Sequence, residues 1–228
     1  VIEAVKHASW NNNLKPEFHW IDSKKFEKDK KKLIELKKLD GIIVPGGFGK
    51  SGIDGKIDTI RYARENKIPY LGLCLGMQLA VVEYARNVCG IKDANTVEVE
   101  KKAEHPVIDF IPEQVEIIQE SRYGATMRLG SWPAVLKKGT KIYKLYGEKR
   151  VSERHRHRYE VNPNYVEKLE DCGIVFSGRS PDGVLMEFME LKNHPYFVAT
   201  QAHPEFKSRP MNPAPLFNGL IKAAKKFR

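Results

Sequence analysis

Apolar residues follow two different spacings along the first ninety residues of this chain. Short continuous apolar runs at 41–44 and 68–73 predict strands that are buried on both faces. Apolar residues three or four positions apart predict helices around these runs. The expected helices are residues 1–10, 24–39, 57–65 and 77–88, and a further short strand is expected at 17–21. This alternation predicts βαβ crossovers and a parallel sheet.

The second half of the chain has a different pattern. Strand-like segments at 173–177, 184–191 and 196–202 are separated by short turns, which predicts strands added antiparallel to the sheet. An amphipathic helix is expected at 213–226. The predicted fold class is therefore α/β: a doubly wound, mainly parallel sheet flanked by helices, with antiparallel strands added in the C-terminal half. One domain over residues 1–228 is expected, and because such domains usually begin with a strand, we expect its first strand to be missing.

Composition places the chain among ordinary globular proteins. Of its 228 residues, 41% are hydrophobic and 30% are charged, which argues against a disordered chain. The longest apolar stretch, around 68–80, is interrupted by glycines and a glutamine, so no membrane-spanning segment is expected. Three cysteines are too few for a disulfide framework, so we expect a reducing compartment, the cytoplasm. Two of them, Cys89 and Cys172, are expected to be buried structural thiols.

The formal net charge of +10 is the one unusual compositional property. The excess lies mainly at 24–38, 149–158 and 222–228, and the first of these runs is interleaved with acidic residues. One interpretation is a surface that binds nucleic acid, which predicts steeply salt-dependent binding. The other, which we favour, is a lysine-rich solvated surface. Neither nucleic acid nor a membrane is therefore expected as a partner.

The sharpest motif is Gly-Leu-Cys-Leu-Gly-Met-Gln at 72–78. It places Cys74 between a predicted buried strand and a predicted helix, which is the arrangement of a nucleophile elbow. Gly72 and Gly76 permit a tight turn and close packing. The N-terminus of the helix is expected to lower the pKa of the thiol. The alternative is an inert buried cysteine, but the flanking glycines favour a catalytic nucleophile.

A histidine and an acid follow at the end of the last predicted strand, in Gln-Ala-His-Pro-Glu at 201–205. His203 is a candidate to exchange a proton with the thiol. Glu205 is a candidate to hold the imidazole in the correct tautomer. Pro204 restricts the backbone of the residue before it and so helps to set the direction of the imidazole.

A third motif is the turn Pro-Gly-Gly-Phe-Gly at 45–49. Its glycines allow backbone N–H groups to point at a ligand, so the turn is a candidate oxyanion hole. A phosphate-binding loop is the alternative, but the turn lacks the Gly-Lys-Ser/Thr ending of a P-loop.

These three motifs, in this chain order, resemble those of the class I (triad) glutamine amidotransferases. The resemblance implies that Cys74 attacks the side-chain amide carbon of glutamine, and that the N–H groups of Gly47 and Leu75 hold the oxyanion. It implies that His203 protonates the departing ammonia and that Glu205 orients His203. Water would then hydrolyse a glutamyl thioester on Cys74.

Longer segments narrow the resemblance to the glutaminase domains of the CTP synthase family, over nearly the whole chain. The similar segments are residues 46–56, 72–80, 126–130, 193–197 and 153–162, the last of which contains Arg-His-Arg-His-Arg-Tyr-Glu. The resemblance implies that glutamine is bound by Gly47, Leu75, Gln78, Glu98 and Arg158. An acid and a guanidinium are suited to the α-ammonium and α-carboxylate of free glutamine.

The same resemblance implies partners outside these 228 residues. In the CTP synthase family an amidoligase domain binds UTP, ATP and Mg²⁺ and aminates UTP to CTP, and GTP promotes glutamine hydrolysis. That domain is expected to be absent here, so no cofactor or metal is expected in this domain, and the full enzyme is expected to be a homo-oligomer. The alternative is the amidotransferase subunit of another glutamine-dependent synthetase, for GMP, anthranilate or carbamoyl phosphate.

Four features fall outside the family pattern or outside the proposed site. Ala202 stands where the family usually has an aromatic residue, and the stretch 115–123 fits the family poorly. His155 and His157 are spaced as a metal-binding pair on one strand face. No cysteine or carboxylate cluster completes that set, so surface or loop roles are expected for both.

Overall fold

The structure, a computed structural model, describes residues 1–110 and 127–227, so the stretch 115–123 lies outside the described residues. The strands of its large sheet are β1 (Ile42–Val44), β2 (Tyr70–Leu73), β5 (Arg128–Leu136), β6 (Arg150–His157), β8 (Ile174–Arg179), β9 (Met186–Leu191) and β10 (Phe197–Thr200). A smaller sheet contains β3 (Ala94–Thr96), β4 (His105–Phe110) and β7 (Tyr159–Val161). The helices are α1 (Ile2–Asn11), α2 (Lys24–Lys28), η1 (Lys30–Lys38), α3 (Ile53–Glu65), α4 (Leu75–Asn87), α6 (Lys141–Tyr146), α7 (Pro163–Asp171), η4 (Pro204–Lys207) and α8 (Pro215–Phe227).

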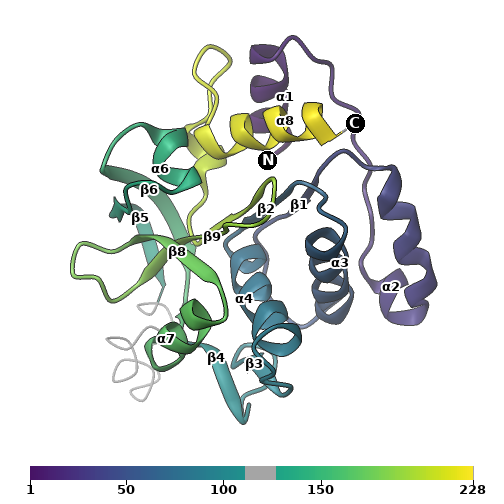
Figure 1. Ribbon diagram of the computed structural model, residues 1–228, viewed down its shortest axis with the longest axis vertical. Coiled ribbons are helices and arrows are strands. Elements are labelled where there is room, and N and C mark those ends of the chain that lie inside the picture. Colours follow the sequence, from purple (N-terminus) through teal and green to yellow (C-terminus); the bar gives the residue numbers. More distant parts are fainter. Residues whose placement is uncertain (111–126, 228) are drawn as a thin grey trace.

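The large sheet has the strand order β1-β2-β10-β9-β8-β5-β6 (Figure 1). β1, β2 and β10 pair parallel to one another. β9, β8, β5 and β6 continue the sheet in antiparallel pairs. The predicted α/β fold class and the antiparallel addition in the C-terminal half are therefore confirmed. β10 joins the two parts, because it is parallel to β2 on one side and antiparallel to β9 on the other.

Helices cover both faces of the parallel part of the sheet (Figure 1). Successive side chains of a strand point to opposite faces. Tyr70 and Phe197 pack in the cluster that contains α3 and α4, whereas Leu71, Leu73 and Val198 pack in the cluster that contains α1, α6 and α8. This two-sided burial explains why β2 is apolar at every position rather than at every second one.

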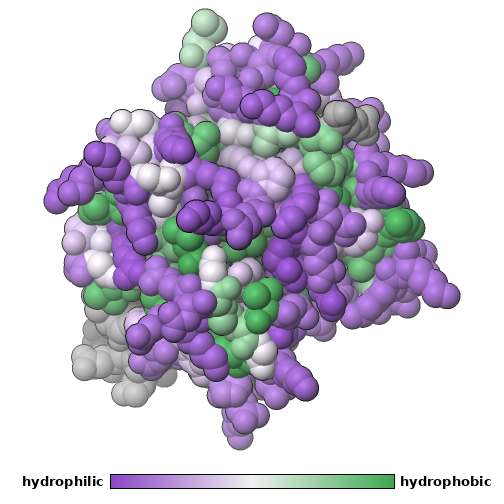
Figure 2. Space-filling model, in the orientation of Figure 1, coloured by the Kyte–Doolittle hydropathy of each residue, from purple (hydrophilic) through white to green (hydrophobic). Residues whose placement is uncertain are grey.

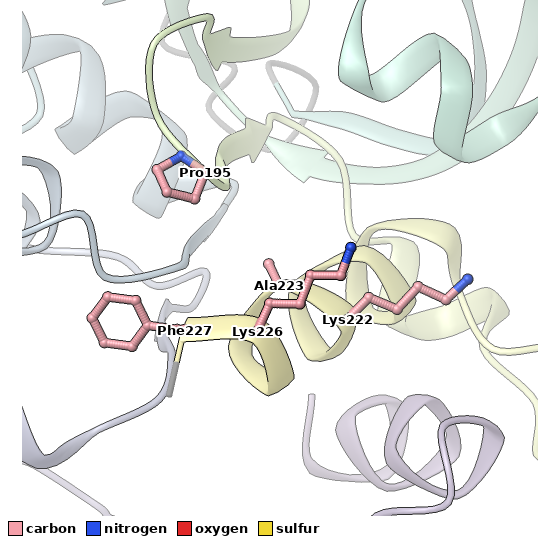
Figure 3. A pocket seen from close by; sticks show the side chains of 5 residues that line it. All are labelled: Pro195, Lys222, Ala223, Lys226 and Phe227. Atoms are coloured by element: carbon pink, nitrogen blue, oxygen red, sulfur yellow. The ribbon is translucent and has the colours of Figure 1, made fainter.

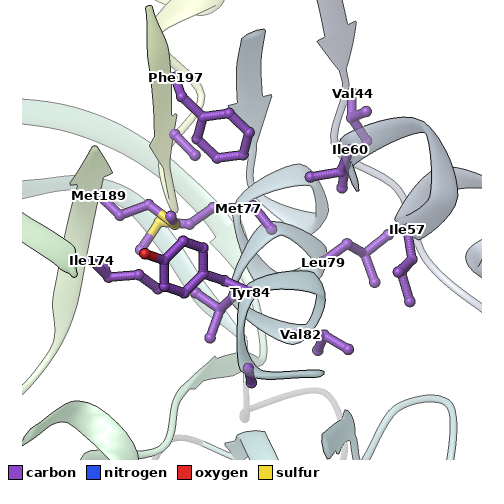
Figure 4. Close-up of a cluster of buried hydrophobic side chains, with 14 of the residues drawn as sticks. Val44, Ile57, Ile60, Met77, Leu79, Val82, Tyr84, Ile174, Met189 and Phe197 are labelled. Carbon is purple, nitrogen blue, oxygen red and sulfur yellow. The ribbon is translucent and has the colours of Figure 1, made fainter. Parts of the chain in front are cut away.

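Helix α4 is almost completely enclosed by the rest of the protein. Met77, Leu79 and Val82 are fully buried, and Figure 4 shows them among side chains of α3, β8, β9 and β10. A helix with apolar residues on all of its sides belongs inside a core, and the buried Glu83 of α4 is paired with Arg64 at 2.8 Å. Because Cys74 immediately precedes α4, this packing also holds the position of the cysteine.

Two elements predicted from the pattern are wrong. Residues 17–21 form no strand, because Phe18 and Trp20 are 37% and 80% exposed and no neighbouring strand pairs with them in the described part of the chain. The predicted helix 24–39 is interrupted at Asp29, which is extended (φ −150°, ψ 97°), and the chain continues as the 3-10 helix η1. The Asp29 carboxylate accepts a hydrogen bond from the N–H of Lys31 and so starts this second helix.

The surface is mostly hydrophilic on the face shown in Figure 2, with apolar side chains in smaller patches. This fits the solvated-surface interpretation of the net charge. Among the described helices, none is both long enough and apolar enough to cross a membrane.

Candidate active site

Cys74 occupies a sharp turn between β2 and α4. Its backbone lies at φ 50°, ψ −105°, a strained conformation for a residue other than glycine. Such strain costs on the order of 1–3 kcal/mol and clusters at functional sites. A Cβ on Gly76 would lie 2.1 Å from the Val44 carbonyl oxygen, and one on Gly72 would lie 2.8 Å from the Gly76 carbonyl oxygen. Only glycine therefore fits at either position, and the predicted elbow is present.

The carboxyl ends of the three parallel strands bring the predicted motifs together. The turn 45–49 follows β1, Cys74 follows β2, and His203 lies three residues after the end of β10. The Cys74 N–H donates to the Thr200 carbonyl oxygen at 2.8 Å, which joins the elbow to β10. This edge of an open α/β sheet is the usual position of a ligand site.

His203 and Glu205 form a hydrogen-bonded pair. The His203 Nδ1 lies 2.8 Å from the Glu205 Oε1, and the His203 N–H donates to the Arg154 carbonyl oxygen at 2.8 Å. The Phe206 ring lies 5.5 Å from the imidazole, centroid to centroid. Ala202, where an aromatic was expected, is itself buried. The imidazole is therefore supported by Phe206, and its Nε2 is left to face the site.

Gly46 shows how close the histidine and the cysteine lie. A Cβ added to Gly46 would be 2.6 Å from His203 Cε1, 3.4 Å from His203 Nε2 and 3.4 Å from Cys74 Cβ. His203 and Cys74 thus border the same small volume over the glycine turn. A Cβ on Gly47 would contact Leu75 Cδ2 at 3.4 Å, so the two residues predicted to supply the oxyanion hole also lie side by side.

The Cys74 thiol is 3% exposed, and burial raises its pKa to about 12. The N–H of Leu75 hydrogen-bonds to it and lowers the pKa, but carboxylates at Glu160, Glu205 and Glu98 raise it further. The expectation of a lowered pKa is wrong for this site, because burial outweighs the helix N-terminus. At neutral pH the cysteine is a thiol, and it must pass its proton to a base before or while it attacks.

The sulfur has a neighbour that sequence reasoning missed. The Gln201 Nε2 donates to Cys74 Sγ at 3.7 Å, and the thiol donates to the Arg156 carbonyl oxygen at 3.8 Å. Gln201 is completely buried. The one indication in the sequence was that Gln201 stands two residues before His203. This spacing does not predict that the Gln201 side chain contacts the sulfur.

The residues predicted to bind glutamine lie around this edge. Glu98 accepts a hydrogen bond from the N–H of Gly49 at 2.8 Å, in the turn that also contains Gly47. Burial raises the pKa of Glu98, and the Gly49 hydrogen bond and the charge of Arg158 oppose the rise. Gln78 is buried and donates to the Tyr159 carbonyl oxygen at 2.9 Å. The structure therefore places an acid and a guanidinium near each other beside the turn, whereas the Gln78 amide is buried against Tyr159 and Gln201.

His155 and His157 are buried, so the expected surface or loop roles are wrong. They alternate with exposed residues along β6, and the Nδ1 of His155 lies 2.9 Å from the Nε2 of His157. Arg128 bridges the buried carboxylates of Glu160 and Glu187 at 3.3 and 2.7 Å, and each histidine lies within 3.6 Å of one of these acids. No group of three or more potential metal ligands is found among the described residues. These side chains form a buried cluster of ion pairs, in which the Glu160 Oε2 and Glu187 Oε2 atoms have no hydrogen-bond partner among the described residues.

One surface cavity lies away from this site. Its volume is about 370 Å³, and its lining comes from Pro195 and from Lys222, Ala223, Lys226 and Phe227 of α8 (Figure 3). Pro195 precedes β10, whereas His203 follows it, so the cavity lies at the opposite end of that strand. None of the predicted site residues lines it.

Comparison with known proteins gives consistent results. The chain matches the family model "Glutamine amidotransferase class-I" over residues 1–223. It is 56% identical over 229 residues to the CTP synthase of Methanococcus maripaludis, covering 98% of this chain and 42% of that protein. It is 54% identical over 227 residues to the CTP synthase of Pyrococcus furiosus, covering 99% of this chain and 41% of that protein. The chain therefore spans about two fifths of the length of these relatives.

Solved structures also match. The glutaminase domain of Trypanosoma brucei CTPS, determined with bound acivicin, has a TM-score of 0.92 at 36% identity, covering 99% of this chain and 86% of that one. A Thermoplasma acidophilum protein assigned to the GMP synthase subunits has a TM-score of 0.55 at 16% identity, covering 86% and 78%. The second match shows a shared fold alone.

Proposed function

Because the chain belongs to the class I glutamine amidotransferases and, within them, to the glutaminase domains of the CTP synthase family, we propose that it hydrolyses L-glutamine to glutamate and ammonia through a thioester on Cys74. The observation that carries the proposal is the strained cysteine after β2, with the His203–Glu205 pair after the neighbouring strand β10. A nucleophile, a base and an orienting acid at one sheet edge form a catalytic triad.

The first half of the reaction forms the thioester. His203 Nε2 takes the proton of the Cys74 thiol as the sulfur attacks the side-chain amide carbon of glutamine. The oxygen of that amide becomes an oxyanion and accepts hydrogen bonds from the N–H groups of Gly47 and Leu75. When the tetrahedral intermediate collapses, the C–N bond breaks and His203 returns the proton to the departing nitrogen, which leaves as ammonia.

The second half releases glutamate. His203 takes a proton from water as the water oxygen attacks the thioester carbon, and the C–S bond then breaks. The proton returns to the sulfur of Cys74, and the enzyme is restored. Glu205 accepts a hydrogen bond from His203 Nδ1 throughout, which keeps Nε2 free for these transfers and stabilises the imidazolium.

The charged end of the substrate is matched by Glu98 and Arg158. Glutamine differs from a side-chain amide in a protein by its α-ammonium and α-carboxylate. Glu98 receives the ammonium and Arg158 the carboxylate, so both charges are paired when the amide lies over Cys74. Gln78 completes the binding site beneath the amide.

We further propose that the ammonia is used to aminate UTP to CTP, because the relatives at 54–56% identity are CTP synthases. Residues 1–228 are then the glutaminase domain, and the amination occurs in an amidoligase domain that holds UTP, ATP and Mg²⁺. GTP acts on that larger enzyme as the activator of glutamine hydrolysis.

Replacement of the nucleophile tests the proposal. Cys74→Ala removes the group that forms the thioester, so glutamate release from L-glutamine should fall by about 10⁴-fold or more. Cys89→Ala is the matched control, because Cys89 lies beyond the far end of α4. Intact mass after incubation with acivicin gives a second reading: one adduct on the unmodified protein and on Cys89→Ala, and none on Cys74→Ala. Glutamate release that survives Cys74→Ala contradicts the proposal.

A further inference from the structure

The Cys74 sulfur lies in surroundings that oppose its ionisation. It is buried, and the charged groups that act on it most strongly are the carboxylates Glu160, Glu205 and Glu98. A thiolate formed there needs hydrogen-bond donors, because burial removes water from around it. Apart from the N–H of Leu75, the described donor that reaches the sulfur is the Nε2 of Gln201, at 3.7 Å.

The orientation of the Gln201 amide follows from its neighbours. The Tyr159 carbonyl oxygen can only accept, so the amide nitrogen of Gln78 must point at it, at 2.9 Å. The same nitrogen donates to Gln201 Oε1 at 3.3 Å. With its oxygen facing Gln78, the Gln201 amide must turn its nitrogen to the sulfur of Cys74. The thiol donates its hydrogen bond to the Arg156 carbonyl oxygen. The lone pairs of the sulfur therefore remain able to accept a hydrogen bond from Gln201.

The backbone holds this amide in place. The Gln201 N–H donates to the Glu187 carbonyl oxygen at 2.9 Å, and the side chain is completely buried. A donor fixed in this way needs no reorganisation when charge appears on its acceptor. Gln201 therefore differs from a flexible surface amide, which would lose entropy to reach the sulfur.

We propose that Gln201 is a further catalytic residue, whose carboxamide donates a hydrogen bond to Cys74 Sγ and stabilises the thiolate when the proton passes to His203. Gln78 is the positioning residue that sets the direction of this amide. The catalytic meaning rests on the proposed function, but the hydrogen bond to the thiolate is a property of the protein that can be measured without glutamine.

The test is a pH titration of the Cys74 thiolate, followed by its absorbance near 240 nm and by the rate of alkylation with iodoacetamide. A Cys89→Ser/Cys172→Ser background leaves Cys74 as the single thiol. Gln201→Leu keeps the approximate size of the side chain and removes the donor. Below the midpoint of the titration, each unit by which the thiol pKa rises lowers the thiolate fraction about tenfold. We expect Gln201→Leu to lower both signals by about tenfold or more at a fixed pH.

Thr200→Val is the matched control. Thr200 is also buried on this stretch. Its hydroxyl donates to the same Glu187 carbonyl oxygen at 3.0 Å, and it accepts from the Ala202 N–H at 3.1 Å, so neither of its hydrogen bonds goes to the sulfur. The parent and Thr200→Val should give the same titration. Gln78→Leu, which keeps Gln201 but removes its orienting donor, should give a smaller loss in the same direction and serves if Gln201→Leu does not fold.

The proposal is overturned if the thiolate titrations of the parent, Gln201→Leu and Gln78→Leu superimpose. It is also overturned if Thr200→Val shifts the titration as much as Gln201→Leu does. The two proposals fail separately. A protein that shows the expected titration but releases no glutamate contradicts the function alone, whereas active protein with an unshifted titration contradicts the role of Gln201 alone.

Discussion

Two of the histidine–carboxylate pairs among the described residues have the same residue types in very different surroundings. His203 and Glu205 lie 2.8 Å apart and keep 12% and 9% of their side-chain surface exposed beside Cys74. His155 and Glu187 lie 3.6 Å apart, and only 2% and 1% of their side-chain surface is exposed. Burial, aided by the charge of Arg128, lowers the pKa of His155 to about 3. The first pair lies at the sheet edge beside Cys74, where the proposed reaction needs a proton carrier, and the second cannot take up a proton near neutral pH.

The difference shows that residue type and spacing do not decide which histidine reaches the sheet edge that carries Cys74. His155 lies in a longer and more distinctive histidine motif than His203, yet it points into the protein from β6. His203 lies just past a strand end, where the chain leaves the sheet and its imidazole borders the same small volume as the Cβ of Cys74. Position at the sheet edge, rather than the motif, separates a proton carrier from a structural side chain.

The largest difference in kcat should appear when each of the two histidines is replaced by glutamine in a separate variant. His203→Gln removes the base and acid of the proposed reaction, so kcat for glutamate release should fall on the order of 10³-fold. His155→Gln should lower kcat by less than tenfold, because both ring nitrogens of His155 face buried neighbours, His157 and Glu187. Steady-state glutamate release measures both, and circular dichroism shows that each variant is folded. Equal losses in the two variants would remove the distinction between the pairs.

A smaller effect should follow when His203 is displaced instead of removed. A Cβ at Gly46 would meet the His203 ring at 2.6 Å, so Gly46→Ala should push the imidazole away from Cys74 and lower kcat about a hundredfold. Gly41→Ala is the matched control, because Gly41 lies outside the proposed site and its Cβ would meet no atom closer than 3.5 Å. Its loss should be less than tenfold. If Gly41→Ala is the more damaging change, the close approach at Gly46 does not set the geometry of the site.

The smallest effect concerns the buried pair and appears in stability. The folded-state pKa of His155 is depressed from 6.5 to about 3. Below about pH 6.5 the unfolded chain therefore binds a proton that the folded protein does not, and stability is lost as the pH falls. Each such histidine contributes about 1.4 kcal/mol per pH unit in this range.

Glutamine does not titrate, so His155→Gln should make the free energy of unfolding less dependent on pH between about pH 6 and pH 4 by that amount. Urea unfolding at several pH values measures the slope. A variant whose slope equals that of the unmodified protein would place the acid sensitivity elsewhere, for example at His194, whose pKa burial lowers to about 4.

Local patterns were sufficient to predict the elements that position Cys74. The apolar run of β2, the glycines around Cys74 and the spacing in α4 each predict their structure, because a buried parallel strand and a tight strand-to-helix turn leave few residue types acceptable. The same reasoning failed at 17–21, where an alternating pattern has no partner strand among the residues that the structure describes. It also failed at 24–39, where a single aspartate ends one helix and starts another.

Contacts between residues far apart in sequence determine the features that the local pattern could not predict. The pKa of Cys74 depends on burial by chain segments far away in sequence, and its effect outweighs the helix N-terminus that local reasoning relied on. The contact between Gln201 and the sulfur joins residues 127 positions apart. No spacing within a motif encodes such a distance.

The sequence by itself determined the fold class, the cysteine elbow, and the identity of the residues at the ends of β1, β2 and β10, because each follows from local sterics and from the period of apolar residues. Only the tertiary structure decided which of these side chains meet. Packing of α4 against the sheet holds Cys74, pairing of β10 with β2 brings His203 and Gln201 to it, and β6 turns His155 into the interior. Burial and electrostatics act through space, so they become definite only once the chain is folded.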